Sequence, residues 1–265
     1  MKKIASIGFV LALSVSCALL LAQTPGTPQH PTHAPATHAA PAPAFDRALL
    51  TPSLLTRKAP DTYEVKFVTT KGAFVVTVTR AWAPNGADRF YNLVRHHYYD
   101  NASFFRAIQG FMVQFGLSAY PEVNRVWEDA NIADDPVKQS NVAGYITYAQ
   151  TSAPNSRSTQ VFINLADNSR LDSERFAPFG QVTEGMDVVN QLYTGYGEGA
   201  PDGNGPTQDA VASKGRAYLD KNYPKLDSIK TATLVLPAAA PKPAPKPTAK
   251  ATPKPAPPPP GTAVD

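Results

Sequence analysis

Between Ser103 and Gly116 the chain reads Ser-Phe-Phe-Arg-Ala-Ile-Gln-Gly-Phe-Met-Val-Gln-Phe-Gly. This run sets one arginine, Arg106, among large apolar side chains, and an amide side chain, Gln114, follows eight positions later. Strand alternation would place Phe104 and Arg106 on the same face. Arginine stays charged and offers several rigid hydrogen-bond donors. The pattern therefore suits a largely apolar ligand that has one amide group to accept these hydrogen bonds. Taken alone, the run equally fits a strand whose arginine extends to water.

Two later segments carry further motifs. The segment Tyr148–Asn164 is rich in turn-forming residues and ends in Gln-Val-Phe-Ile-Asn, and a Phe-x-x-Phe-Gly motif runs from Phe176 to Gly180. Together with the first run, these segments resemble the cyclophilin family of peptidyl-prolyl cis–trans isomerases. The resemblance covers roughly residues 63–235, about two thirds of the chain, and the motifs follow the order that the family has.

Four blocks of the chain match family motifs. The matches are Phe104-Phe105-Arg106 to Phe-His-Arg, Gly110-Phe111-Met112-Val113-Gln114 to Gly-Phe-Met-x-Gln, Ala149-Gln150 to Ala-Asn, and Gln160-Val161-Phe162 to Gln-Phe-Phe, with Leu171 at a pocket leucine. Besides Gln150 and Val161, which differ from the family residues just given, three further positions depart from the pattern. Phe105 replaces a histidine, Phe176 stands where many members carry histidine or tyrosine, and Arg170 stands where an aromatic residue is typical. Because an indole at that last position helps to hold cyclosporin, tight binding of the drug is not expected.

The resemblance also implies roles for these residues. Arg106 would donate hydrogen bonds to the prolyl amide, as the catalytic residue. Gln114 would hold the Arg106 side chain or the substrate backbone, and Gln150 would bind the backbone of the residue before proline. The implied pocket for the proline ring consists of Phe111, Met112, Phe162 and Leu171, and Ala149, Gln160 and Phe176 complete the implied substrate-binding set.

The chemistry of this activity explains why such residues would suffice. Rotation about an X-Pro bond has a barrier of about 18–20 kcal/mol because amide resonance must be broken. No nucleophile, metal or cofactor is required, since the enzyme needs only to bind the twisted amide better than either planar form. We therefore expect a peptidyl-prolyl isomerase that acts on X-Pro bonds of unfolded or loop polypeptides. The alternative is a non-catalytic module or chaperone that holds proline-containing peptides in the same pocket.

The resemblance and the hydrophobic pattern together predict a mainly β fold. Residues 63–68 and 73–79 alternate like paired strands around a Thr-Lys-Gly turn, and helices are expected from about Pro84 and over residues 185–193. Residues 127–141 are expected to form a polar connection. A last strand over residues 227–236 would complete a closed, eight-stranded antiparallel barrel capped by two helices.

The two ends of the chain differ in composition from its middle. Residues 1–22 have the charge and apolar run of a secretory signal peptide with cleavage after Ala22, which predicts an exported bacterial protein of the periplasm or cell envelope. A lipid anchor at Cys17 is the less favoured alternative. Residues 23–60 form a Pro/Ala/His-rich linker and a leucine-containing strap, residues 61–236 the isomerase domain, and residues 237–265 a Pro/Lys/Ala-rich disordered tail.

Charge limits the classes of partner. The formal net charge is +4, but four lysines lie in the tail, so the folded part is near neutral and nucleic-acid binding is not expected. The tail would adopt polyproline II and either act as a plain spacer or contact the cell envelope or an aromatic groove of a partner. A monomer is expected.

Overall fold

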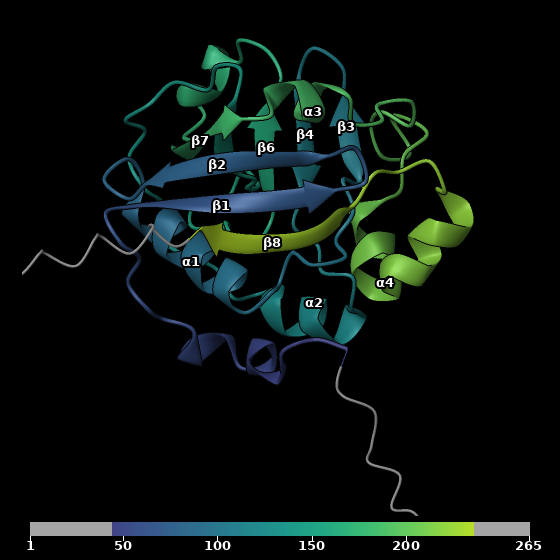
Figure 1. Cartoon of the computed structure of the whole chain (residues 1–265), viewed down its shortest axis with the longest axis horizontal. Helices are drawn as coiled ribbons and strands as arrows, with labels where there is room; N and C mark the ends of the chain where they lie inside the picture. Colours follow the sequence, from purple (N-terminus) through teal and green to yellow (C-terminus); the bar gives the residue numbers. More distant parts are fainter. Residues whose placement is uncertain (1–43, 236–265) are drawn as a thin grey trace, which may run out of the picture. The chain divides into compact units, whose positions relative to one another are not determined.

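Figure 1 shows the chain as a computed structural model, and the structure describes residues 44–235. The predictions for residues 1–22, for the linker up to residue 43 and for the tail from residue 237 lie outside the described residues. Eight strands form one antiparallel sheet in the order β3-β4-β6-β5-β7-β2-β1-β8, so the predicted mainly β architecture is confirmed. The strands are β1 (Thr62–Thr69), β2 (Ala73–Thr79), β3 (Arg106–Ile108), β4 (Met112–Phe115), β5 (Tyr145–Tyr148), β6 (Val161–Asn164), β7 (Pro178–Glu184) and β8 (Ile229–Val235).

The hairpin of β1 and β2 forms as the alternation predicts. Every second side chain of β1 is buried, and the buried rings of Phe67 and Phe74 stack across the pair with centroids 4.8 Å apart. Gly72 allows the turn between the strands because its φ of 143° is one that other residues rarely adopt. These inward side chains form one wall of the main core.

The sheet curls, but its two edge strands do not join in a continuous ladder. Among residues 44–235, the bridge that spans the seam is an isolated one between Ser103 and Ser228. Its backbone bonds run from the N–H of Ile229 to the carbonyl of Ala102 at 2.8 Å and from the N–H of Phe104 to the carbonyl of Asp227 at 3.0 Å. The prediction of a closed barrel is therefore slightly wrong. The reason is that β3 contains only three residues, too few to pair along β8.

The bridge at Ser103 also disrupts the alternation expected before β3. Phe104 is buried in the main core, whereas Arg106 lines a groove, so the prediction that these two side chains share a face is wrong. Phe105 packs instead in a separate cluster with residues of a later helix. Residues 104 and 105 belong to no strand, and regular pleating therefore does not fix their side-chain directions.

The described helices are more numerous than the two expected. They are α1 (Pro84–Arg95), α2 (Pro121–Trp127), α3 (Met186–Asn190) and α4 (Gln208–Asn222), with short 3-10 helices η1 (Arg47–Leu50), η2 (Pro52–Leu54) and η3 (Ser169–Asp172). The helix predicted from Pro84 is confirmed as α1, and the one predicted over residues 185–193 is the shorter α3. Neither α2 nor α4 was expected; the two helices pack together beside the sheet (Figure 1). Within residues 44–235, no helix has both the length and the apolar character needed to cross a membrane.

The leucine-containing strap before β1 packs on the sheet domain. Leu49 is fully buried, and its carbonyl accepts a hydrogen bond from Nε1 of Trp127 at 2.8 Å. Leu54, by contrast, is 75% exposed, so only part of the strap contributes to the core. Trp127 was expected in a polar connection, but it ends α2 as a buried residue because this contact satisfies its only polar atom.

Candidate active site

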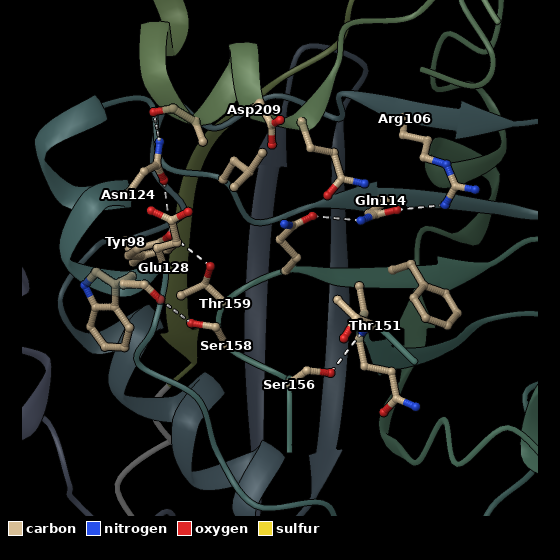
Figure 2. Close-up of a pocket in the computed structure, with 18 of the residues that line it drawn as sticks. Tyr98, Arg106, Gln114, Asn124, Glu128, Thr151, Ser156, Ser158, Thr159 and Asp209 are labelled. Carbon is tan, nitrogen blue, oxygen red and sulfur yellow. Dashed lines mark hydrogen bonds between the residues drawn. The ribbon is translucent and has the colours of Figure 1, made fainter. Parts of the chain in front are cut away.

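One groove gathers all ten residues that the sequence motifs indicated. It has a volume of about 760 Å³ and lies between β4, β6 and η3 on one side and α2 and α4 on the other (Figure 2). The residues are Arg106, Phe111, Met112, Gln114, Ala149, Gln150, Gln160, Phe162, Leu171 and Phe176. Segments distant in the sequence thus meet in a single site.

The apolar end of the groove is a small cluster separate from the main core. Met112, Phe162 and Leu171 are buried there, and partly buried neighbours pack around them. The ring of Phe176 meets that of Phe162 edge to face, with centroids 5.8 Å apart. Such a cluster offers a dry, aromatic surface for a small apolar ring.

A row of polar side chains crosses the strands beside this cluster. The register of β3 and β4 sets Arg106 opposite Gln114, and Nη1 of Arg106 donates to Oε1 of Gln114 at 2.9 Å. Nε2 of Gln114 in turn donates to Oε1 of Gln160 at 2.8 Å (Figure 2). Of the two roles expected for Gln114, the structure shows the one in which it holds the arginine.

A carboxylate on the other side of Arg106 was not expected. Nε of Arg106 donates to Oε1 of Glu198 at 2.7 Å, and Nη2 donates to Oε2 at 2.6 Å. The hydrogen bonds from Arg106 lower the pKa of Glu198 despite its partial burial, so the carboxylate stays ionised at neutral pH. Glu198 lies in a glycine-rich stretch, and no local signal in the sequence connects it to an arginine 92 positions earlier.

Comparison with known proteins identifies the family. The family model described as cyclophilin type peptidyl-prolyl cis-trans isomerase/CLD matches residues 64–213, more than half of the chain. The chain belongs to the cyclophilin family. It is accordingly a peptidyl-prolyl cis–trans isomerase of the cyclophilin type.

Individual relatives agree with this family assignment. The cyclophilin is 35% identical over 138 residues to a peptidyl-prolyl cis-trans isomerase of Acinetobacter baylyi, a match that covers 48% of this chain and 70% of the relative. It is 31% identical to peptidyl-prolyl cis-trans isomerase B of Escherichia coli, covering 48% of this chain and 82% of that protein. A solved cyclophilin of Cryptosporidium parvum, 16% identical, aligns with a TM-score of 0.50 over 67% of this chain and 99% of its own, which shows the shared fold.

Gln150, which lines the groove of this cyclophilin, and Arg170, which contacts a groove aromatic, make contacts that the sequence does not reveal. Nε2 of Gln150 donates to the carbonyl of Glu174 at 2.9 Å, and its buried Oε1 has no hydrogen-bond partner among the described residues. The guanidinium of Arg170 lies 4.8 Å from the ring centroid of Phe111. A charged side chain therefore packs on this pocket residue from the position where the family typically has an aromatic residue. Gln150 thus keeps an acceptor at the groove.

The opposite end of the groove in this cyclophilin is polar and comes from the unexpected helices. Tyr98 donates to Oγ1 of Thr159 at 3.0 Å, and burial raises the pKa of Tyr98 well above its usual value. Nδ2 of Asn124 donates to the carbonyl of Ala212 at 3.1 Å and thereby ties α2 to α4. This end was missed because the buried face of α4 consists of Val211, Gly215 and Leu219, which give too weak an apolar stripe to indicate a helix.

Proposed function

We propose that Arg106 drives X-Pro bond rotation while the cluster of Met112, Phe162 and Leu171 holds the proline ring. The observation that supports this most directly is the placement of Arg106. Its guanidinium lines the same groove as the apolar cluster, and its Nη1 lies 3.9 Å from the sulfur of Met112. A bound proline would therefore bring its amide to the arginine. No other group need react, because the step breaks no covalent bond.

The arginine acts by binding the twisted amide more strongly than the planar one. When the amide twists, its lone pair localises on the prolyl nitrogen, which then becomes a hydrogen-bond acceptor. A charged donor strengthens its bond to that atom, and each gain of about 1.4 kcal/mol in the transition state gives about a tenfold acceleration. The groove magnifies this effect because its apolar wall limits competing water.

The substrates in this proposal are proline-containing unfolded or loop segments of exported proteins. The support for export is the signal-like sequence of residues 1–22, which would place the monomeric enzyme in the periplasm or cell envelope. The Pro/Lys-rich tail from residue 237 would contact the envelope surface. Cell fractionation with N-terminal sequencing tests this: export predicts a mature chain that begins at Gln23, and an intact cytosolic chain would contradict it.

The test of the catalytic role is an exchange measurement by NMR on an Ala-Pro peptide. Arg106→Ala should lower the rate of cis–trans exchange at saturating peptide by about 100-fold, with the peptide dissociation constant changed less than about fivefold. Arg47→Ala, on the exposed η1, is the matched control and should keep the wild-type rate. An Arg106→Ala variant with an unchanged rate would contradict the proposal. A wild-type protein that bound the peptide without accelerating exchange would favour a binding module.

A further inference from the structure

The loop that carries Glu198 is paired with the strand that carries Arg106. An antiparallel bridge joins Ala107 of β3 to Gly197. In an antiparallel register the next pair outward is Arg106 and Glu198, so the two side chains face each other across the bridge. Their ion pair is therefore fixed by backbone pairing as well as by charge.

The loop itself is held tightly around the carboxylate. The backbone N–H of Gly199 donates to Oε1 of Glu198 at 2.8 Å, and the N–H of Gly205 donates to the carbonyl of Glu198, also at 2.8 Å. A Cβ added to Gly205 would lie 2.8 Å from that carbonyl oxygen, so only glycine allows this approach. The loop thus fixes the backbone of Glu198 and gives its carboxylate one hydrogen bond besides the two from Arg106.

The contacts around Arg106 leave a defined part of the guanidinium free for substrate. A guanidinium has five N–H bonds in a rigid plane. Within the described residues, Glu198 takes one from Nε and one from Nη2, and Gln114 takes one from Nη1. The second N–H of Nη1 points to the sulfur of Met112 at 3.9 Å, a weak acceptor that a substrate amide can displace, and the second N–H of Nη2 has no partner among the described residues. Both flanks of the plane are held, so its orientation is set before a peptide arrives.

We propose that Glu198 is a positioning residue for the isomerase reaction, acting through Arg106. The inference rests on the proposed catalytic role of Arg106. Without Glu198, the long arginine side chain would be held by Gln114 alone and would sample several rotamers. Its free donors would then be oriented toward the twisted amide for a smaller fraction of the time. Glu198 does not itself touch the substrate.

Partial exposure separates this positioning role from a structural one. The side chains of Arg106 and Glu198 are 24% and 35% exposed, and ion pairs of such exposure contribute little to the stability of a fold. Removal of Glu198 should therefore alter the rate without unfolding the domain. A loop held by its own backbone bonds also keeps its path when the side chain is truncated.

A double-mutant cycle tests the inference. The variants are Glu198→Ala, Glu198→Gln, Arg106→Ala and the double Glu198→Ala/Arg106→Ala, with Asp202→Asn as the control. Asp202 lies in the same loop, is exposed, and joins no ion pair within residues 44–235. For each protein, NMR exchange gives the rate at saturating Ala-Pro peptide, titration gives the dissociation constant, and thermal melting reports the fold.

We expect Glu198→Ala to lower the exchange rate about tenfold, with the dissociation constant changed less than about twofold and an unchanged melting temperature. Glu198→Gln should recover part of the rate, because its single oxygen accepts only one of the two arginine bonds. The double variant should be no slower than Arg106→Ala alone, and Asp202→Asn should match the wild type. The resonance of the Arg106 Nε–H should also shift in both Glu198 variants.

Three outcomes would overturn the inference. A rate in Glu198→Ala equal to or above that of the wild type would mean that the carboxylate is idle or competes with substrate for the donors. A double variant about tenfold slower than Arg106→Ala would mean that Glu198 acts through another group. If Glu198→Ala slows exchange in proportion to a loss of folded protein, its role is structural. An unchanged rate in Arg106→Ala would instead refute the proposed function, together with any role that acts through this arginine.

Discussion

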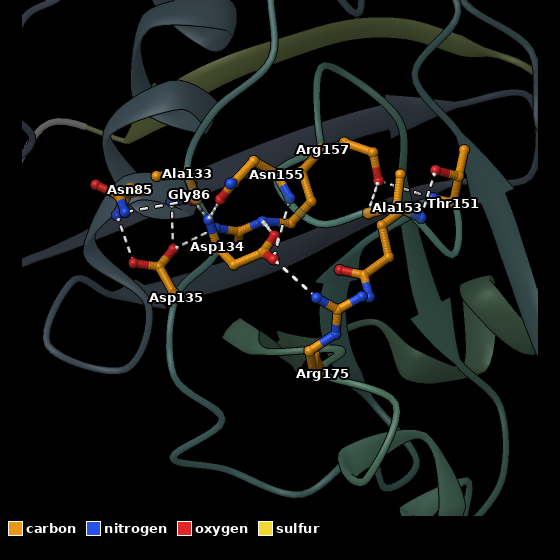
Figure 3. Close-up of polar contacts among 12 residues, drawn as sticks. Asn85, Gly86, Ala133, Asp134, Asp135, Thr151, Ala153, Asn155, Arg157 and Arg175 are labelled. Carbon is orange, nitrogen blue, oxygen red and sulfur yellow. Dashed lines mark hydrogen bonds and ion pairs between the residues drawn. The ribbon is translucent and has the colours of Figure 1, made fainter.

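Arg157 and Asp135 form an ion pair, 3.0 Å from Nη2 to Oδ2, in which both side chains are almost completely buried. Asp135 also accepts hydrogen bonds from the backbone N–H groups of Asn85 and Gly86 at the start of α1, at 3.0 and 2.9 Å (Figure 3). Arg157 lies between Ser156 and Ser158, which line the groove. The pair therefore links the helix to the groove wall.

Loss of the carboxylate charge at Asp135 should destabilise the fold. Asp135→Asn leaves the guanidinium of Arg157 buried without an equal counter-charge, so the free energy of unfolding should fall by about 3–5 kcal/mol. Urea denaturation measures this change. The exposed Asp129→Asn is the control and should stay within about 0.5 kcal/mol of the wild type. A loss of less than about 1 kcal/mol in Asp135→Asn would show that Asp134, which is 3.7 Å from Arg157, replaces it.

Gly116 should tolerate no side chain. Its φ is 110°, and an added Cβ would lie 2.5 Å from the carbonyl oxygen of Thr159 and 2.7 Å from Cα of Gln160. Gly116→Ala should therefore lower the free energy of unfolding by about 2 kcal/mol or more and reduce isomerase activity, because Gln160 must move. Gly110→Ala is the matched control: its φ is also positive, but its Cβ would meet nothing within 4 Å, so only the backbone cost of about 1 kcal/mol is expected. Equal effects of the two variants would contradict the steric account.

The Asp172 carboxylate should stabilise the fold at neutral pH and lose this effect in acid. Partial burial raises the pKa of Asp172, but hydrogen bonds from Ser140 and Asn141 outweigh it, and the net pKa is lowered. A lowered pKa stabilises the folded state above the unfolded value of about 4, and this stabilisation disappears as the pH falls through the lower folded value. Asp172→Asn should therefore have a lower urea midpoint than the wild type at pH 7, and the two midpoints should converge below about pH 4. A difference that is constant with pH would contradict this linkage, and the exposed Asp202→Asn should differ little at either pH.

The apolar cluster of the groove should contribute to substrate affinity separately from stability. Leu171→Ala removes part of the surface proposed for the proline ring, so the dissociation constant of an Ala-Pro peptide should rise about tenfold. Leu219→Ala is the matched control, because Leu219 is buried to a similar extent but in the separate cluster around Phe105. Both variants should lose about 2–5 kcal/mol of stability, and only the first should weaken binding in a titration. Equal affinities of the two variants would exclude Leu171 from the proline pocket.

The sequence predicted most of the sheet and the identity of the groove residues. Alternation revealed the β1–β2 hairpin because each strand has one buried face, and the short motifs revealed the groove because they keep a fixed order and spacing. The direction of the Phe104 side chain was predicted wrongly, because an isolated bridge at Ser103 stands where a regular strand was expected. The prediction also missed Glu198, because a contact between segments far apart in the sequence leaves no periodic or local signal. It missed α4 because a glycine, Gly215, stands between the two apolar residues of the buried face, Val211 and Leu219.

The pairing of β1 with both β2 and β8 has a consequence for synthesis on the ribosome. The first strand of the sheet needs the last one as its neighbour, so the emerging chain cannot complete its sheet until residue 235 has left the exit tunnel. Until then one edge of β1 has no partner and could recruit strands from other chains. The outward charges of Glu64 and Lys66 on β1 guard against such aggregation during that wait. An enzyme that accelerates prolyl isomerisation in other chains thus completes its own sheet late in synthesis, and charged residues on the exposed face of β1 oppose aggregation until then.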